Sequence, residues 1–71
     1  MTITIRDDYI KLGQALKLAN LVPDGAAAKM EITSGLVKVN GETDTRRGRK
    51  LYPGDTFTYH SETCQIISNQ E

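Results

Sequence analysis

The chain has 71 residues, with nine basic and nine acidic side chains and no net charge. This balance excludes a tail that binds any polyanion indiscriminately, but it allows a local basic face, because salt screens exposed charges within about 8 Å. The length predicts one domain over residues 1–71.

The first twenty residues predict a short strand followed by a helix. Thr2–Ile5 alternates polar and apolar β-branched residues, as a half-buried strand does. Asp7 or Asp8 would cap a helix that starts at Tyr9. From there the period changes to that of one helical face, formed by Leu12, Ala15, Leu16 and Ala19. Gly13 weakens a helix relative to alanine, so we expect a close packing contact at that position.

A second helix is predicted after a short connection at residues 20–23. Asp24 is the expected N-cap, and the alanines after it are strong helix formers. Ala28 and Ile32 form a narrow apolar stripe, and Ser34-Gly35 stops the helix. Because the connection is short, the two helices should be neighbours in space.

The rest of the chain predicts strands and turns. Residues 36–40 alternate again, and Asn40-Gly41 is a strong signal for a type I′ hairpin turn with a returning strand at 42–45. Pro53-Gly54-Asp55 is a predicted turn, and residues 56–60 and 64–67 form a final hairpin. The predicted fold class is therefore α+β, with both helices on one side of a mostly antiparallel sheet.

A basic segment separates these two hairpins. Arg46, Arg47, Arg49 and Lys50 are four of the nine basic residues in the chain. Lys and Arg neutralise phosphates, and the planar guanidinium of Arg can hold a phosphate by two hydrogen bonds. The alternative is a solvated loop that keeps a sheet edge soluble.

Two stretches carry a resemblance to a known family. Behind two helices, "SGLVKVNGE" is followed by the basic segment and "LYPGDTF". This arrangement over residues 10–57 resembles the RNA-binding domain named for ribosomal small-subunit protein four, also called the alpha-L motif. The stretch "DGAAAKMEI" resembles more narrowly the small stand-alone bacterial members, which are the YaaA- and YbcJ-like proteins. The resemblance implies non-catalytic binding of structured RNA, namely ribosomal RNA or a ribosomal particle.

Charge, exposure and this resemblance together give a set of candidate RNA-binding residues, which are Arg46, Arg47, Arg49, Lys50, Lys38, Lys29, Asn40, Tyr52 and Lys11. Many members begin the second helix with Ser-Arg, whereas this chain has Gly25-Ala26, so Lys29 is the nearest cation. Lys11 and Lys17 lie on the exposed flank of the first helix, and either could instead be a plain solvated lysine.

The strand and loop candidates also have two interpretations. Lys38 and Asn40 should point away from a core that Val37 and Val39 enter, although for Asn40 the turn is a better explanation than a contact with RNA. Tyr52 beside the basic segment is the better stacking candidate for an unpaired base, because the other aromatic residues of the final hairpin should fill the core.

Catalysis, metals and cofactors have little support in the sequence. His60 and Cys64 are the single histidine and cysteine, which excludes an internal disulfide and a zinc site and leaves no orienting third group for a nucleophile. A phosphate-cradling loop with the P-loop pattern is missing. We expect no enzyme activity, no cofactor, no metal and no small-molecule substrate. A lone thiol without a signal-like or membrane-length apolar run predicts a cytoplasmic protein that is not a membrane partner.

Two other functions compete with RNA binding. A protein–protein adaptor could use the same basic loop against an acidic partner. A ubiquitin-like sulfur carrier would also show a "VNGE" and "GD" pattern, but such carriers end in Gly-Gly, whereas this chain ends Ser68-Asn69-Gln70-Glu71. We expect a monomer that binds structured RNA.

Overall fold

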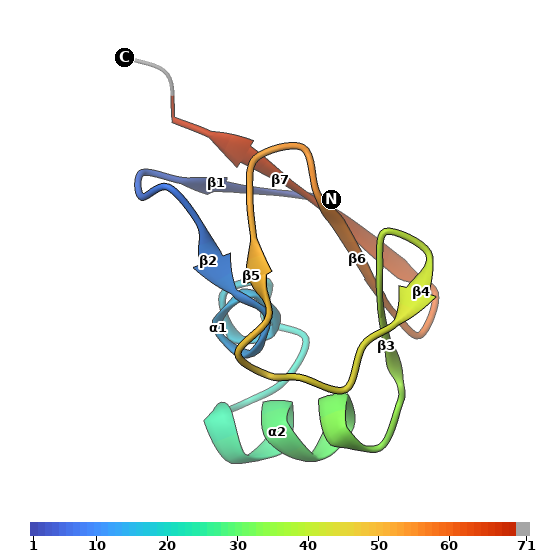
Figure 1. The fold of residues 1–71 in the computed structure, drawn as a ribbon. Helices are drawn as coiled ribbons and strands as arrows, with labels where there is room; N and C mark the ends of the chain where they lie inside the picture. The colour runs from blue at the N-terminus through green and yellow to red at the C-terminus, as the bar shows by residue number, and fades with distance from the viewer. Residues whose placement is uncertain (70–71) are drawn as a thin grey trace.

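The computed structural model describes residues 1–69 of the chain. Within this range the elements follow in the order β1 Thr2–Ile5, β2 Ile10–Lys11, α1 Leu12–Leu18, α2 Gly25–Thr33, β3 Val37–Val39, β4 Glu42–Thr43, β5 Lys50–Leu51, β6 Thr56–Tyr59 and β7 Glu62–Ser68. They form a five-stranded sheet in the order β1-β7-β6-β3-β4 and a two-stranded sheet of β2 and β5, as Figure 1 shows.

The larger sheet is mostly antiparallel, as predicted. β3 pairs with both β4 and β6 in antiparallel fashion, and β6 pairs with β7 in the same way. Only β1 runs parallel to its neighbour, with Thr2 opposite Gln65 on β7. The alternation along the strands buries one face, which includes Ile3, Phe57 and Ile66. The opposite face carries mainly threonine and other polar side chains.

Both helices contribute to the core that this buried face forms. Leu12, Ala15 and Leu16 of α1 and Ala28 and Ile32 of α2 are buried, which confirms the predicted apolar faces. Tyr59 of β6 is also buried, as predicted, and its hydroxyl donates a hydrogen bond to Glu31 of α2. This hydrogen bond to a carboxylate raises the pKa of Tyr59 above its usual value.

The first helix begins later than predicted, and neither Asp7 nor Asp8 caps it. Its N-cap is Lys11, which makes no side-chain capping hydrogen bond. Residues 10–11 are instead a strand, with Ile10 opposite Leu51 of β5. The helix receives its capping partners from the basic segment: Leu12 N donates to Arg49 O at 2.8 Å and Gly13 N donates to Arg47 O at 3.0 Å.

The predicted close contact at Gly13 therefore exists, but it is a backbone contact. A Cβ at this position would lie 3.6 Å from Arg47 O, which is an ordinary van der Waals distance. Glycine is consequently not required by space, and the hydrogen bond between the two backbones is what joins the helix to the loop.

The second helix begins and ends as predicted. The Asp24 side chain accepts a hydrogen bond from Ala27 N at 2.8 Å, so it is the N-cap. At the other end Gly35 has φ +80°, and Gly35 N donates to Ile32 O while Leu36 N donates to Glu31 O. These bonds satisfy the last carbonyls of the helix and turn the chain into β3.

The turns confirm the sequence signals, although several strands differ in length from their predictions. Asn40 has φ 51° and Gly41 has φ 87°, as a type I′ turn requires. The strands around this turn are shorter than predicted, with β3 at Val37–Val39 and β4 at Glu42–Thr43. β7 begins at Glu62 rather than at residue 64, because the β6–β7 turn uses only residues 60–61.

Pro53-Gly54-Asp55 also forms the predicted turn. Asp55 N donates to Tyr52 O at 2.9 Å, and Tyr52 N donates back to the Asp55 carboxylate at 2.8 Å. Gly54 takes φ +99°, a conformation that favours glycine. This reciprocal bonding fixes the backbone at Tyr52, directly after β5.

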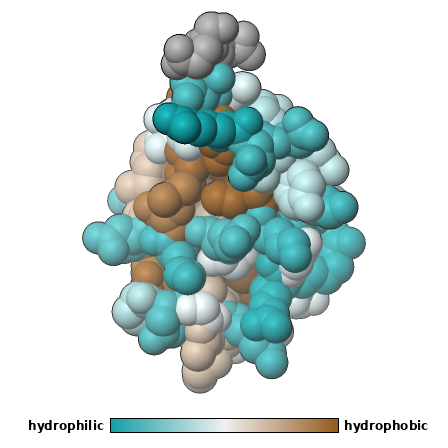
Figure 2. All heavy atoms as spheres, turned by 90° about the vertical axis from the view of Figure 1, so that its left-hand side faces the viewer, coloured by the Kyte–Doolittle hydropathy of each residue, from teal (hydrophilic) through white to brown (hydrophobic). Residues whose placement is uncertain are grey.

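One side of the molecule leaves apolar surface uncovered. Figure 2 shows an apolar band on the side that carries β1, β2 and α1, with hydrophilic side chains above and below it. Leu18 at the end of α1 is 60% exposed, and Ile10, Ala19 and Leu21 are only partly buried against the core.

Three sequence-based expectations concern the C-terminal residues, membrane crossing and metal binding. Gln70 and Glu71, on which the sulfur-carrier comparison depended, lie outside the described residues. In residues 1–69 no helix has the length and hydropathy needed to cross a membrane. Across the same residues, no three His, Cys, Asp or Glu side chains gather where a metal ion could bind.

Candidate nucleic-acid interface

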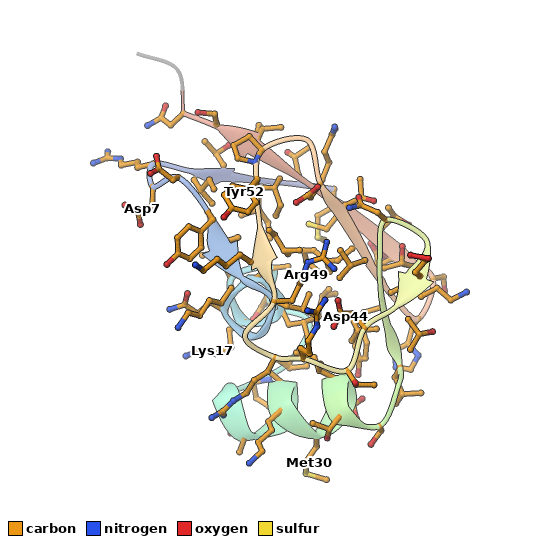
Figure 3. The ribbon with its side chains drawn as sticks, in the orientation of Figure 1. Asp7, Lys17, Met30, Asp44, Arg49 and Tyr52 are labelled. Atoms are coloured by element: carbon orange, nitrogen blue, oxygen red, sulfur yellow. The ribbon has the colours of Figure 1, made fainter. Side chains whose placement is uncertain are left out.

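A buried carboxylate organises the basic segment. Asp44 lies between β4 and this segment and is 8% exposed. It accepts hydrogen bonds from Arg46 Nε at 3.0 Å, Arg46 Nη2 at 2.7 Å, Arg46 N at 3.0 Å and Arg49 Nη1 at 2.8 Å. The Arg46 hydrogen bonds hold the pKa of the Asp44 carboxyl well below its usual range, and they raise the pKa of Arg46. Figure 3 labels Asp44 and Arg49 in the middle of the molecule.

Two of the four basic side chains are thus part of the fold. The side chain of Arg49 is 31% exposed and that of Arg46 is 68% exposed. The pairs that Arg46 and Arg49 form with Asp44 are the only ion pairs among residues 1–69. Arg46 still presents its outer edge to solvent, whereas Arg49 is largely enclosed.

Arg47 leads to a different surface. Its carbonyl accepts from Gly13 N, which brings the residue to the start of α1. Arg47 also lines a shallow pocket of about 290 Å³. The residues that form this pocket are Lys11, Gly13, Gln14, Lys17, Gly25, Arg47 and Gly48. This lining contains three cations and no carboxylate.

Lys50 extends this surface across the two-stranded sheet. Lys11 of β2 and Lys50 of β5 are directly opposite each other in the antiparallel register, and both are exposed. Like charges at such positions destabilise a sheet by a few tenths of a kcal/mol up to about 1 kcal/mol. A bound anion would remove this repulsion. We call Lys11, Lys17, Arg47 and Lys50 the basic flank.

An aromatic pair adjoins the basic flank. Lys50 Nζ lies 4.8 Å from the centroid of the Tyr9 ring, a cation–π distance. The Tyr9 and Tyr52 ring centroids are 5.8 Å apart with an angle of 51° between the planes. Tyr52 is 48% exposed and follows β5, so one side of its ring remains accessible beside the cations.

The other candidate residues lie elsewhere. Lys38 is exposed on the face of β3 opposite the core, and Lys29 is exposed on α2. The Asn40 side chain is occupied within the fold: its Oδ1 accepts from Thr56 N at 2.9 Å and its Nδ2 donates to the Asp55 carboxylate at 3.2 Å. These hydrogen bonds explain the presence of an asparagine at position 40 without any contact with RNA.

The single cysteine and histidine do not form a reactive pair. Cys64 faces the core, and burial raises the pKa of its thiol, which disfavours the reactive thiolate. His60 is exposed in the β6–β7 turn and packs against the Tyr59 ring, with centroids 4.2 Å apart.

Sequence reasoning missed two residues of this site. It did not single out Asp44, although an acid two positions before Arg46 and five before Arg49 could have indicated an internal partner. It treated Tyr9 only as a helix start, whereas its ring contacts both Lys50 and Tyr52. The signal for Tyr9 was absent, because β2 and β5 are too short to show a strand pattern.

Comparison with known proteins decides the family. The family model of the S4 domain matches residues 3–67 of the chain. The chain belongs to the S4 domain family. The probable ribosome maturation protein RlbA of Bacillus subtilis is 51% identical to this S4 domain over 53 residues, which cover 75% of each protein.

Two further relatives agree with this assignment, one of them a solved structure. The solution structure of YbcJ from Escherichia coli, described as revealing an alpha-L motif involved in RNA binding, superimposes with a TM-score of 0.72 at 31% identity. That match covers 93% of this chain and 85% of YbcJ. Tyrosine–tRNA ligase 2 of Pseudoalteromonas translucida is 40% identical over 62 residues, which are 15% of that enzyme. The alpha-L resemblance predicted from the sequence is therefore confirmed, including its two helices and mostly antiparallel sheet.

Proposed function

We propose that this S4 domain binds structured RNA without catalysing a reaction, and that the basic flank is its principal contact surface. The single observation that carries the proposal is the convergence of Lys11, Lys17 and Arg47 on one shallow pocket without a carboxylate. Lys50, directly opposite Lys11, adds a fourth charge. Folded RNA is recognised largely through its shape and phosphates, which is what such a surface offers.

The remaining candidates have secondary roles in this proposal. Tyr52 stacks on a base next to the flank, since its ring is half exposed and packs on Tyr9, whose ring Lys50 contacts. Arg46 contacts phosphate with its outer edge, while Arg49 mainly orients the loop through Asp44. Lys29 and Lys38 lie farther from the flank and contribute by long-range attraction. Asn40 contributes indirectly, because it stabilises the turn between β3 and β4.

The target is proposed to be ribosomal RNA or a ribosomal particle. The name of RlbA, a probable ribosome maturation protein, supports this proposal, as does the RNA-binding alpha-L motif described for YbcJ. We propose that the protein acts in the cytoplasm and as a monomer.

A matched pair of double variants tests the location of the interface. Lys11→Gln/Arg47→Gln removes two charges from the basic flank, and Lys29→Gln/Lys38→Gln removes two exposed charges elsewhere. Binding to a structured ribosomal RNA fragment is measured by filter retention at several salt concentrations. The flank variant should lose about 30-fold in affinity and flatten the log–log salt slope by about 2. The control variant should lose less than about 3-fold.

Three outcomes separate the competing explanations. Equal losses in both variants would mean diffuse electrostatic attraction and would refute the flank as the interface. Unchanged affinity in both would exclude the flank as an RNA site. Absence of RNA binding by the unaltered protein would leave a protein adaptor with an acidic partner as the explanation of the basic surface.

A further inference from the structure

A groove lies beside the basic flank, between the end of β1 and α1. It measures about 640 Å³, and its apolar part is formed by Ile5, Ile10 and Leu18, with the Tyr9 side chain in its lining as well. Leu18 is 60% exposed, so part of the apolar lining of the groove is open to solvent. Figure 2 shows the apolar band with hydrophilic side chains around it. We call the hollow of about 640 Å³ the β1–α1 groove.

The β1–α1 groove and the pocket of the basic flank adjoin each other across α1. Gln14 and Lys17 of α1 line both of them. A strand of RNA whose phosphates lie on Lys11, Lys17 and Arg47 therefore passes the mouth of the groove. An unpaired base of that strand can leave the stack and enter an apolar site with little movement of the backbone.

An acid in the lining indicates which base fits. Asp7 lines the groove together with two cations, Arg6 and Lys17, and its carboxylate makes no ion pair within residues 1–69. Phosphate is attracted to Arg6 and Lys17 and repelled by the carboxylate, so the favourable partner of Asp7 on the RNA is a hydrogen-bond donor. Guanine presents N1–H and N2–H side by side on its Watson–Crick edge, and one carboxylate can accept from both. Adenine offers a single donor group there, next to an acceptor nitrogen that the carboxylate repels.

We propose that the β1–α1 groove binds an unpaired guanine of the RNA held by the basic flank. Ile5, Ile10 and Leu18 contact the base, and Asp7 accepts hydrogen bonds from its Watson–Crick edge. This inference rests on the proposed RNA-binding function, and it specifies that the target carries a bulged or looped guanine next to a structured segment.

Three RNA hairpins that differ at one bulged position test the proposal, with guanine, adenine or an abasic site at that position. The unaltered protein should bind the guanine bulge about 10-fold more tightly than either other hairpin, as expected for one bidentate base contact. Asp7→Asn should reduce this preference to less than about 3-fold. Asp8→Asn is the matched control, because Asp8 carries the same charge on the same loop but does not line the groove. Asp8→Asn should keep the full preference.

A second variant tests the apolar part of the groove. Leu18→Gln should weaken binding to the guanine hairpin about 5-fold or more and leave the abasic hairpin unchanged, because stacking and apolar contact with the base are lost. Leu36→Gln, which alters another exposed leucine, should leave both affinities unchanged.

The outcomes distinguish this proposal from the RNA-binding function itself. Equal binding of all three hairpins by the unaltered protein would overturn the guanine site while leaving RNA binding intact. Unchanged RNA affinities in Leu18→Gln would also overturn it and would assign the groove to another partner, such as an extended peptide along β1. Failure to bind any hairpin would instead contradict the proposed function.

Discussion

The four basic residues of the loop should separate into two pairs with different consequences when they are removed. Arg46→Ser/Arg49→Ser removes both partners of the buried Asp44 carboxylate, whereas Arg47→Ser/Lys50→Ser removes two cations that make no ion pair within residues 1–69. Each double variant loses two positive charges from the same segment. The first should therefore affect mainly stability, and the second mainly RNA binding.

The expected loss of stability follows from the surroundings of Asp44. Leaving one partner of a fully buried pair without the other costs about 3–5 kcal/mol. Asp44 is 8% exposed and its arginines reach solvent, so screening reduces the value for its unpaired carboxylate to about 2 kcal/mol. For a chain of this size that corresponds to a fall in Tm of about 8–16 °C. Arg47→Ser/Lys50→Ser should stay within about 0.5 kcal/mol of the original protein.

Urea and thermal denaturation followed by circular dichroism measure the stabilities, and RNA titrations at several salt concentrations measure the binding. Arg47→Ser/Lys50→Ser should flatten the salt slope by about 2, and Arg46→Ser/Arg49→Ser by less than about 1. Adding Asp44→Asn to Arg46→Ser/Arg49→Ser should restore about 1 kcal/mol, because the unpaired charge is then gone. Equal stability of the two double variants, or no recovery in the triple variant, would refute the role given to Asp44.

Further predictions concern pH, turns, caps and salt. The folded-state pKa of Asp44 is lowered, so its contribution to stability is present above pH about 4 and disappears as the pH falls through the folded pKa; denaturation between pH 5 and pH 2 should show a smaller loss in Asp44→Asn than in the original protein. Gly41→Val should cost about 1–3 kcal/mol in urea denaturation because φ is +87°, while Gly48→Val, in open space, should cost much less. Asp24→Ala should cost about 1 kcal/mol through loss of the helix cap, and equal stability would exclude the cap. RNA binding by the unaltered protein should have a log–log salt slope of about −3 to −5, and a slope flatter than about −1 would exclude a phosphate-based interface.

Local sequence signals predicted the parts of this fold that are decided locally. Asn40-Gly41 and Gly35 require positive φ, and the Asp24 side chain reaches an amide only three residues away. The helical stripe containing Leu12 and Leu16 also needs no information beyond its own period. Such features depend on a few neighbouring residues, so they can be read without the rest of the chain.

The parts that were wrong or missed depend on contacts between distant residues. The pairing of Ile10 with Leu51 replaced the predicted start of the first helix at Tyr9 with a strand. From the sequence, phosphate or solvent was the expected partner of the basic segment, but Asp44 of the same chain holds Arg46 and Arg49. A charge in a sequence does not show whether its partner is a phosphate or a carboxylate of the same chain.

The loop that carries the cations contributes to the fold through its backbone carbonyls, because Arg47 O and Arg49 O accept the first amides of α1. Substitutions at Arg47 leave this attachment in place, so charge at that position can vary among descendants without a change of architecture. Insertions or deletions between these two carbonyls would shift one of them away from the helix. Natural variation at Arg47 should accordingly be free in residue type, whereas the length of the segment should be restricted. This combination lets one scaffold be adapted to different RNA targets.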